Sequence, residues 1–129
     1  MFEITKDFRF EAAHTLQREV NAAGSRRIHG HSYRAQVALR GLPDPATGMV
    51  MDMGMLEKAM QVAHDALDHR FLDEINDLGP ATLENLSSWI WRHLEAAIPG
   101  LSRVTVYRDS SGESCTYFGP RAGAPEPRA

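Results

Sequence analysis

Two runs within the first forty residues alternate between apolar and polar side chains, which is typical of strands with one buried face. In residues 2–14 the even positions are apolar apart from Lys6, the odd positions from 3 to 11 are polar, and the even set ends at His14. A polar segment, residues 17–27, separates this run from a second one with apolar odd positions from Tyr33 to Leu39. We therefore expect two half-buried strands. A short returning strand at residues 49–51 can follow the turn-rich segment 41–48.

From Met55 onward the apolar period changes to that of a helix. The apolar stripe consists of Leu56, Ala59, Met60, Ala63 and Leu67. A second helix is predicted to begin at Thr82, a good N-cap residue, with Glu84 in the first turn where the helix dipole favours an anion. Pro99 and Gly100 end this second helix.

Two further alternating runs, residues 103–108 and 114–118, predict a closing pair of strands around a turn at residues 110–112. The pattern predicts an α+β domain over residues 1–119, with a four-stranded antiparallel sheet and two helices on one face. The free edges of so small a sheet make assembly through those edges an expectation. Residues 120–129, rich in proline, alanine and glycine, are predicted to be a disordered tail.

Composition and charge disfavour a nucleic-acid-binding or membrane-spanning protein. The chain has 129 residues, 43% of them hydrophobic and 24% charged, and a net charge of −3 with neutral histidines, which disfavours binding to nucleic acid. No apolar run approaches the roughly 20 residues of a membrane span, and the N-terminus lacks the blocks of a signal peptide. The expected setting is cytoplasmic, with a small-molecule substrate and no membrane partner. The single cysteine excludes an intrachain disulfide.

Three histidines carry the strongest chemical signal. His29 and His31 are two residues apart at the start of a strand, so their side chains point to the same face. His14 ends the neighbouring strand on its inward-facing positions. If the two strands pair, three neutral imidazoles converge and leave one tetrahedral position open, which is the arrangement of a catalytic zinc site. The alternative is that these histidines only cover a polar edge of the sheet.

Several segments, in order along the chain, resemble the family of 6-pyruvoyl- and 6-carboxy-tetrahydropterin synthases. They are FEAAH at 10–14, IHGHSY at 28–33, GMVMD at 48–52, LDHRFL at 67–72 and TLENL at 82–86. The resemblance runs from about Phe2 to Phe118. It implies the tunnelling fold, in which strands of several subunits join into a barrel, usually a hexamer built as a dimer of trimers, with active sites at subunit interfaces.

The resemblance also implies a lyase reaction on 7,8-dihydroneopterin triphosphate. Zinc held by the three histidines would polarise side-chain oxygens of the substrate, a base would remove protons, and triphosphate or a two-carbon fragment would depart. Asp68 and His69 would act as a proton relay, with the carboxylate orienting the imidazole. From the residues alone, this pair could equally close the first helix. The segments with Asp52, Thr82 and Glu84 would contact substrate.

Two positions depart from the family pattern. Where the family has a cysteine shortly before the histidine pair, this chain has Ser25, whose hydroxyl is a far weaker acid than a thiol. Glu19 in the same loop is an alternative base. Where the family has a glutamate that accepts from the pterin, this chain has Arg108, which only donates and suits a carboxylate or phosphate. Asp109 or Glu113 could supply the missing carboxylate if the last hairpin shifted in register.

These departures leave three readings of the function. The chain is a zinc-dependent carbon–oxygen or carbon–carbon lyase on a pterin, a divergent enzyme for a non-pterin anionic substrate, or a non-catalytic relative that retains zinc.

Overall fold

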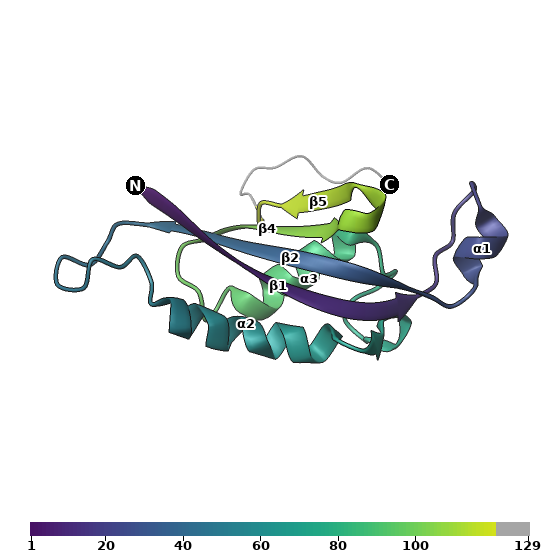
Figure 1. Ribbon diagram of the computed structural model, residues 1–129, viewed down its shortest axis with the longest axis horizontal. Coiled ribbons are helices and arrows are strands. Elements are labelled where there is room, and N and C mark those ends of the chain that lie inside the picture. The colour runs from purple at the N-terminus through teal and green to yellow at the C-terminus, as the bar shows by residue number, and fades with distance from the viewer. Residues whose placement is uncertain (121–129) are drawn as a thin grey trace.

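A computed structural model describes residues 1–120 of the chain. One mixed sheet, with strands in the order β3-β1-β2-β4-β5, is covered by two long helices (Figure 1). The strands are β1 (Phe2–His14), β2 (His29–Gly41), β3 (Arg70–Phe71), β4 (Leu101–Arg108) and β5 (Glu113–Tyr117). The helices are α1 (Ala22–Arg26), α2 (Met53–Leu67) and α3 (Leu83–Leu94), with 3₁₀ turns at Leu72–Glu74 and Asp109–Ser111.

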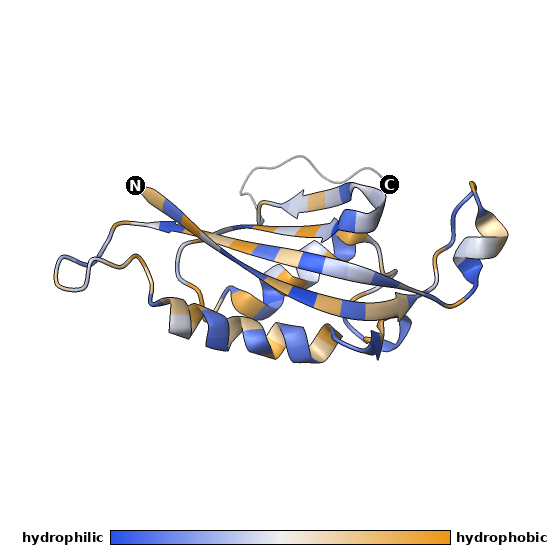
Figure 2. Ribbon diagram, in the orientation of Figure 1, coloured by the Kyte–Doolittle hydropathy of each residue, from blue (hydrophilic) through white to orange (hydrophobic). Residues whose placement is uncertain are grey.

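The alternation in the sequence corresponds to the two faces of the sheet. β1 and β2 pair antiparallel along their whole length, from Phe2 opposite Gly41 to His14 opposite His29. Figure 2 shows hydrophobic and hydrophilic bands alternating along both strands. The apolar side chains of the inner face meet α2 and α3 in one core, in which Phe10, Tyr33 and Val37 are each at most 2% exposed. The predicted α+β class and the two half-buried strands are confirmed.

The sheet differs from the prediction in two ways. It has five strands, because Arg70 and Phe71 add a short strand that runs parallel to β1 beside Ala12 and Ala13. Two residues are too few to show an alternation, so β3 could not be recognised from the sequence. The predicted strand at residues 49–51 is wrong: this segment is a bend that leads into α2, and its methionines follow the turn instead of pairing.

Both long helices begin at the side chains that favour helix starts. The Asp52 carboxylate accepts from the backbone N–H of Gly54 at 2.7 Å, and the Thr82 hydroxyl accepts from that of Asn85 at 3.1 Å. These caps satisfy donors that the first helical turn leaves free. α2 packs mainly on β1 and α3 on β4 and β5, so the inner face is covered along its width.

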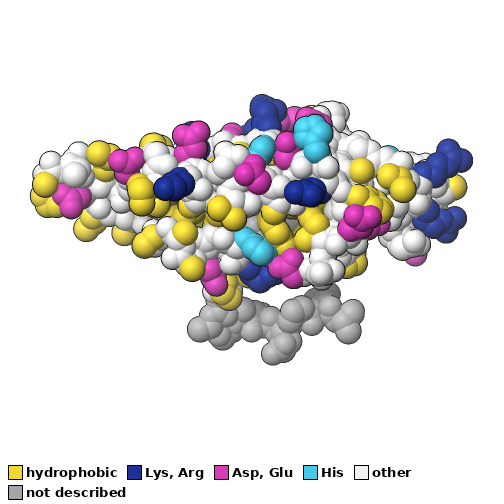
Figure 3. Space-filling view, turned by 90° about the horizontal axis from the view of Figure 1, so that it is seen from below, with side chains coloured by type: hydrophobic (Ala, Val, Ile, Leu, Met, Phe, Trp, Pro, Cys, Tyr) yellow, Lys and Arg dark blue, Asp and Glu magenta, His cyan; other side chains and the backbone are white. Residues whose placement is uncertain are grey.

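The outer face and the edges of the sheet are less covered within residues 1–120. Ion pairs such as Arg40–Glu3 and Arg34–Asp7 lie on the outer face. β3 pairs with only two residues of β1, so along most of its length β1 forms a free edge of the described sheet. Exposed apolar side chains lie near the loop between β2 and α2, and the view from below shows such side chains among charged ones (Figure 3). They include Phe2, Leu42, Met49, Met53 and Met55.

The segment between β1 and β2 contains one short helix that the sequence pattern had placed within a loop. α1 lies beyond the sheet at the end where β1 finishes and β2 begins (Figure 1). The predicted disordered tail falls, from residue 121 onward, outside the described residues. In the part of the chain that is described, no helix has the length and apolar content to cross a bilayer.

Gly100 connects α3 to β4 in a conformation that an added side chain would disrupt. Its φ is +83°, and a Cβ there would lie 2.3 Å from the carbonyl oxygen of Arg40. Gly112 also has a positive φ, +67°, but has open space around it. We expect Gly112→Ala to lower the free energy of unfolding by about 1 kcal/mol, the cost of a left-handed residue with a Cβ. Gly100→Ala adds the backbone overlap and should cost several times as much in urea unfolding. Equal costs for the two variants would contradict this account.

Candidate metal centre

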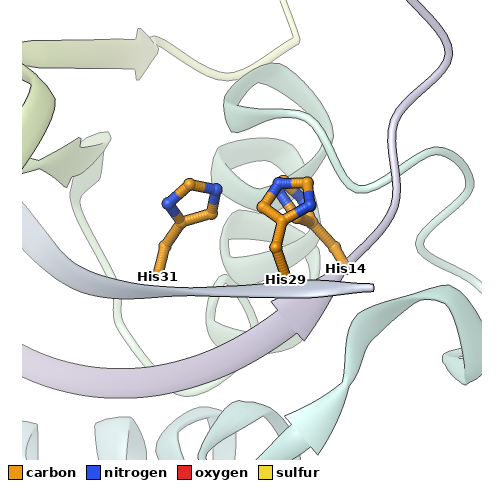
Figure 4. Close-up of side chains that lie close together, drawn as sticks. All are labelled: His14, His29 and His31. Atoms are coloured by element: carbon orange, nitrogen blue, oxygen red, sulfur yellow. The ribbon is translucent and has the colours of Figure 1, made fainter. Parts of the chain in front are cut away.

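Three imidazoles meet on the inner face of the sheet where β1 ends and β2 begins. The register sets His14 opposite His29 and Ala12 opposite His31, so all three histidines point to the helix-covered side. In Figure 4, His29 and His31 rise from one strand and His14 rises beside them from its neighbour. One ligand nitrogen from each residue lies within 4.8 Å of the others. The convergence expected from the sequence is present.

Hydrogen bonds to carbonyl groups orient two of these rings. Nδ1 of His14 lies 2.9 Å from the carbonyl oxygen of Ala81, and Nδ1 of His29 lies 2.8 Å from that of Arg27. Because a carbonyl oxygen only accepts, each Nδ1 carries the proton and each Nε2 keeps its lone pair. This is the usual way in which a metal-binding histidine is fixed in tautomer and direction.

The buried nitrogens that remain are those a metal would need. Nε2 of His14 and Nε2 of His31 are buried and have no hydrogen-bond partner among the described residues. An unpaired buried polar atom is costly, so such atoms call for an explanation. A divalent cation at the centre of the cluster would satisfy both, and the donor set therefore fits zinc.

Burial favours the neutral form of His14 and His31. It lowers the pKa of His14, and the hydrogen bond to Ala81 opposes this only in part. Burial, with smaller contributions from the neighbouring His14 and Arg108, lowers the pKa of His31 to about 4. Neutral imidazole is the form that binds a metal.

A cavity of about 280 Å³ lies next to the cluster. Its walls include four residues that the sequence suggested for the site, Thr82, Glu84, Arg108 and Glu113, and also Tyr33, which the sequence had assigned only to the apolar face of a strand. The Tyr33 ring centroid is 5.7 Å from that of His31. The position of Tyr33, two residues after His31 on the same strand face, was a signal that could have identified it.

Of Asp109 and Glu113, the two carboxylates that the sequence offered in place of the family glutamate, Glu113 lines this cavity, and no shift in register is needed to bring it there. β4 and β5 pair with Arg108 directly opposite Glu113, and an Nη2 of Arg108 donates to Glu113 at 3.1 Å. Asp109 instead accepts two hydrogen bonds from Arg34. The Arg34 guanidinium, the largest influence, holds the pKa of Asp109 below its usual range.

Asp68 and His69 form a hydrogen-bonded pair at the edge of the sheet. Asp68 accepts from the backbone N–H of Glu11 at 2.9 Å and from Nδ1 of His69 at 2.8 Å. The Glu11 hydrogen bond, followed by the one from His69, lowers the pKa of Asp68. The His69 side chain is 80% exposed and borders a separate hollow of about 460 Å³, whose walls also include His31 and Ser32.

Two other residues named from the sequence are not brought to the cluster within one chain. Asp52 caps α2 and borders an apolar hollow with Phe2 and Met49 near the start of β1, whereas the histidines lie near its end. Ser25 is buried in α1, where its backbone carbonyl accepts from the N–H of Leu16. Neither residue borders the 280 Å³ cavity.

A small α+β domain with three imidazoles converging on the inner face of its sheet defines a protein with a candidate metal site of the catalytic kind. A family model described as 6-pyruvoyl tetrahydropterin synthase matches residues 3–120, and the chain belongs to this family.

Individual relatives agree with this assignment. The 6-carboxy-5,6,7,8-tetrahydropterin synthase of Synechocystis is 37% identical over 94% of this chain and 96% of its own length. The human 6-pyruvoyl tetrahydrobiopterin synthase is 40% identical over 61% of this chain and 59% of its own. Among solved structures, the Caenorhabditis elegans 6-pyruvoyl tetrahydropterin synthase matches with a TM-score of 0.80 at 30% identity, over 92% of this chain and 96% of that one. These homologues are tetrahydropterin synthases, which are lyases.

The lowered pKa of His31 makes the stability of the metal-free protein depend on pH. Above pH 6.5 the imidazole is neutral in the folded and the unfolded chain; below it, the unfolded chain takes up a proton that the folded chain binds only near pH 4. We therefore expect the free energy of unfolding of chelated protein to fall as the pH is lowered from 6.5 toward 4. His31→Gln should make this dependence shallower in urea unfolding. An unchanged slope would mean that His31 is not the group responsible.

Proposed function

We propose that this chain is a zinc-dependent lyase that transfers protons and promotes elimination or carbon–carbon cleavage beside a carbonyl or hydroxyl group. The observation that carries the proposal is the pair of buried, unpartnered Nε2 atoms of His14 and His31 facing a third imidazole. Membership in a family of lyases supports the reaction class.

His14, His29 and His31 would hold the zinc ion, and the carbonyl groups of Ala81 and Arg27 keep two of these rings in the binding tautomer. Zinc would act there as a Lewis acid that polarises a substrate oxygen and makes an adjacent C–H group more acidic. Three protein ligands leave a position for that oxygen.

Asp68 and His69 would move the proton. Asp68 accepts from Nδ1 of His69, which leaves the lone pair of Nε2 free to accept a proton from substrate. The second hydrogen bond of Asp68, from the Glu11 backbone, holds the carboxylate in place. Ser25 has no thiol, and its hydroxyl could contribute hydrogen bonding rather than a strong base. Asp68 and His69 are therefore our candidates for this step, ahead of Glu19.

We also propose that the site is completed in a homo-oligomer, a hexamer by resemblance to the family. The relay lies at an edge strand with His69 largely exposed, while the triad lies on the inner face. The long edge of β1 and the exposed apolar side chains near the β2–α2 loop favour association. Asp52, remote from the histidines of its own chain, could then contact substrate bound by another.

A second candidate function is supported by Arg108. At the position where the family has an acceptor for pterin N–H groups, the cavity presents the guanidinium of Arg108, whose side chain is 12% exposed. Because both the guanidinium and the N–H edge of a pterin are donors, their meeting would leave buried donors unpaired, at a cost of about 1–3 kcal/mol each. This favours a divergent enzyme whose substrate is not a pterin and carries a carboxylate or phosphate near Arg108. A non-catalytic protein that retains zinc is the third reading, and intact Asp68 and His69 argue against it.

We predict one zinc ion per chain in protein purified without added metal. His29→Ala should remove most of it, because two imidazoles are a weak site for zinc. Elemental analysis measures the zinc content of the unmodified chain and of the variant. The matched control is His93→Ala, because His93 is a histidine of α3 that hydrogen-bonds to Asp77. Full zinc content in His29→Ala would refute the ligand assignment.

We predict that His69→Gln and Asp68→Asn each lower turnover by roughly 10²–10⁴-fold, the usual contribution of acid–base catalysis, while zinc content stays unchanged. Turnover of the natural substrate and zinc content are measured on the same samples. Full activity in either variant would exclude the relay.

If the relay of one subunit serves the triad of another, co-expressed His69→Gln and His29→Ala chains should regain part of the activity, since mixed interfaces contain one intact set. No recovery in confirmed mixed oligomers would place triad and relay on the same chain.

Substrate choice is decided by a direct assay. Zinc-loaded protein is incubated with dihydroneopterin triphosphate, and pterin products are followed by chromatography. We expect slow conversion, because Ser25 lacks the thiol and Arg108 cannot accept from the pterin. Arg108→Glu should improve pterin binding. Efficient conversion by the unmodified chain would show that Glu113 and Glu84 compensate and that the ordinary family reaction holds.

A further inference from the structure

The cavity beside the histidines contains two buried donors without acceptors. The Tyr33 hydroxyl and Nε of Arg108 are both buried, and neither has a hydrogen-bond partner among the described residues. Tyr33 is 2% exposed, and both side chains line the 280 Å³ cavity. Together with Nε2 of His14 and Nε2 of His31, they are the four buried side-chain polar atoms without partners in residues 1–120.

The sheet register makes these two donors neighbours. β2 and β4 pair Ala35 with Val106 and Arg34 with Tyr107, and the next pair in this register is Tyr33 with Arg108. The two side chains therefore lie side by side on the inner face, within the row that continues to Glu113. His31 precedes Tyr33 by two residues on the same face, so the donors border the histidine cluster.

Packing holds both donors in place. The Tyr33 ring stacks on Phe10 with centroids 4.8 Å apart and an angle of 13°. The Arg108 guanidinium is held by the hydrogen bond from Nη2 to Glu113, which leaves its Nε–H free. Both side chains also line the cavity, so an acceptor supplied by a ligand bound there would satisfy both donors.

We propose that the substrate carries a carboxylate, held by the Arg108 Nε–H and the Tyr33 O–H, next to the atoms that react at the histidine cluster. This rests on the proposed zinc-dependent function and specifies its substrate class. An ionised carboxylate accepts from both donors at once, and hydrogen bonds to a charged group are about twice as strong as neutral ones. Burial raises the pKa of Tyr33 to about 12, so the hydroxyl keeps its proton and donates.

The number of free donors beside the cavity favours a carboxylate over a phosphate. Glu84 and Glu113 line the cavity together with Arg18 and Arg108, so the charges of its side chains balance. A phosphate monoester presents three strong acceptor oxygens and a charge of about −1.5 to −2 at pH 7, more than two donors can satisfy. The two free donors match the two oxygens of a carboxylate.

The test is equilibrium binding of pyruvate, a small carboxylate, to the zinc-loaded oligomer by calorimetry. Tyr33→Phe, which removes only the hydroxyl, should weaken binding about three- to tenfold, and Arg108→Gln at least about tenfold. Arg108→Lys keeps the charge but lacks the Nε–H. It should also bind more weakly, which keeps the test valid if the glutamine variant misfolds.

The matched controls are Tyr107→Phe and Arg40→Gln, on the outer face, which should bind pyruvate as the unmodified chain does. Pyruvamide, the uncharged analogue, and inorganic phosphate are compared with pyruvate.

Three outcomes would overturn the proposal: no saturable pyruvate binding at tens of millimolar, binding that Tyr33→Phe and the Arg108 variants leave unchanged, or phosphate or pyruvamide binding as tightly as pyruvate. Chelation separates this proposal from the zinc proposal. If the metal assignment alone is wrong, chelation leaves pyruvate binding unchanged while its dependence on Arg108 and Tyr33 persists. If the carboxylate site alone is wrong, the zinc content is intact and the two side chains have no effect.

Discussion

The pairing of β1 with β2 is the constraint on which the core and the candidate metal centre both depend. Thirteen residues of each strand are in register, and side chains alternate between faces with a period of two. A slip of one residue would turn Phe10 toward solvent and, by the same step, turn His14 away from His29. The free energy that buries the apolar residues therefore also holds the three imidazoles together, although no direct attraction between them does so.

This arrangement also places the polar atoms of the histidines in an apolar layer. Carbonyl groups of Ala81 and Arg27 satisfy the Nδ1 atoms of two histidines, and these carbonyls come from the segment before α3 and from the loop that precedes β2. Three segments distant in sequence thus have to fold before the lone pairs face one another. The unfolded chain has no such site, so a bound metal ion would stabilise the folded state.

Much of the site could be predicted because it lies on long regular elements. Strand parity was enough to group His14, His29 and His31, and N-cap chemistry was enough to locate Thr82. β3 could not be predicted, since a two-residue strand is defined by its partner, Ala12 and Ala13, and not by its own pattern. The methionines at 49–51 resemble a strand by composition but lack a neighbour to pair with. The role of Glu113 depended on which residue lies opposite Arg108. If the register of the hairpin is uncertain by one residue, the sequence cannot identify that partner.

The position of the proposed relay depends on contacts of another kind. Asp68 ends α2, and its carboxylate reaches the backbone of Glu11, so the helix and the edge of the sheet are joined at this point. His69, with a φ of +57°, turns the chain from the helix into β3 and leaves its ring exposed. A general base left open to water loses much of the advantage that a closed site gives to proton transfer. Burial of the His69 ring requires a surface that residues 1–120 of a single chain do not provide. In the proposed oligomer, a second subunit at the unpaired edge of β1 would supply that surface.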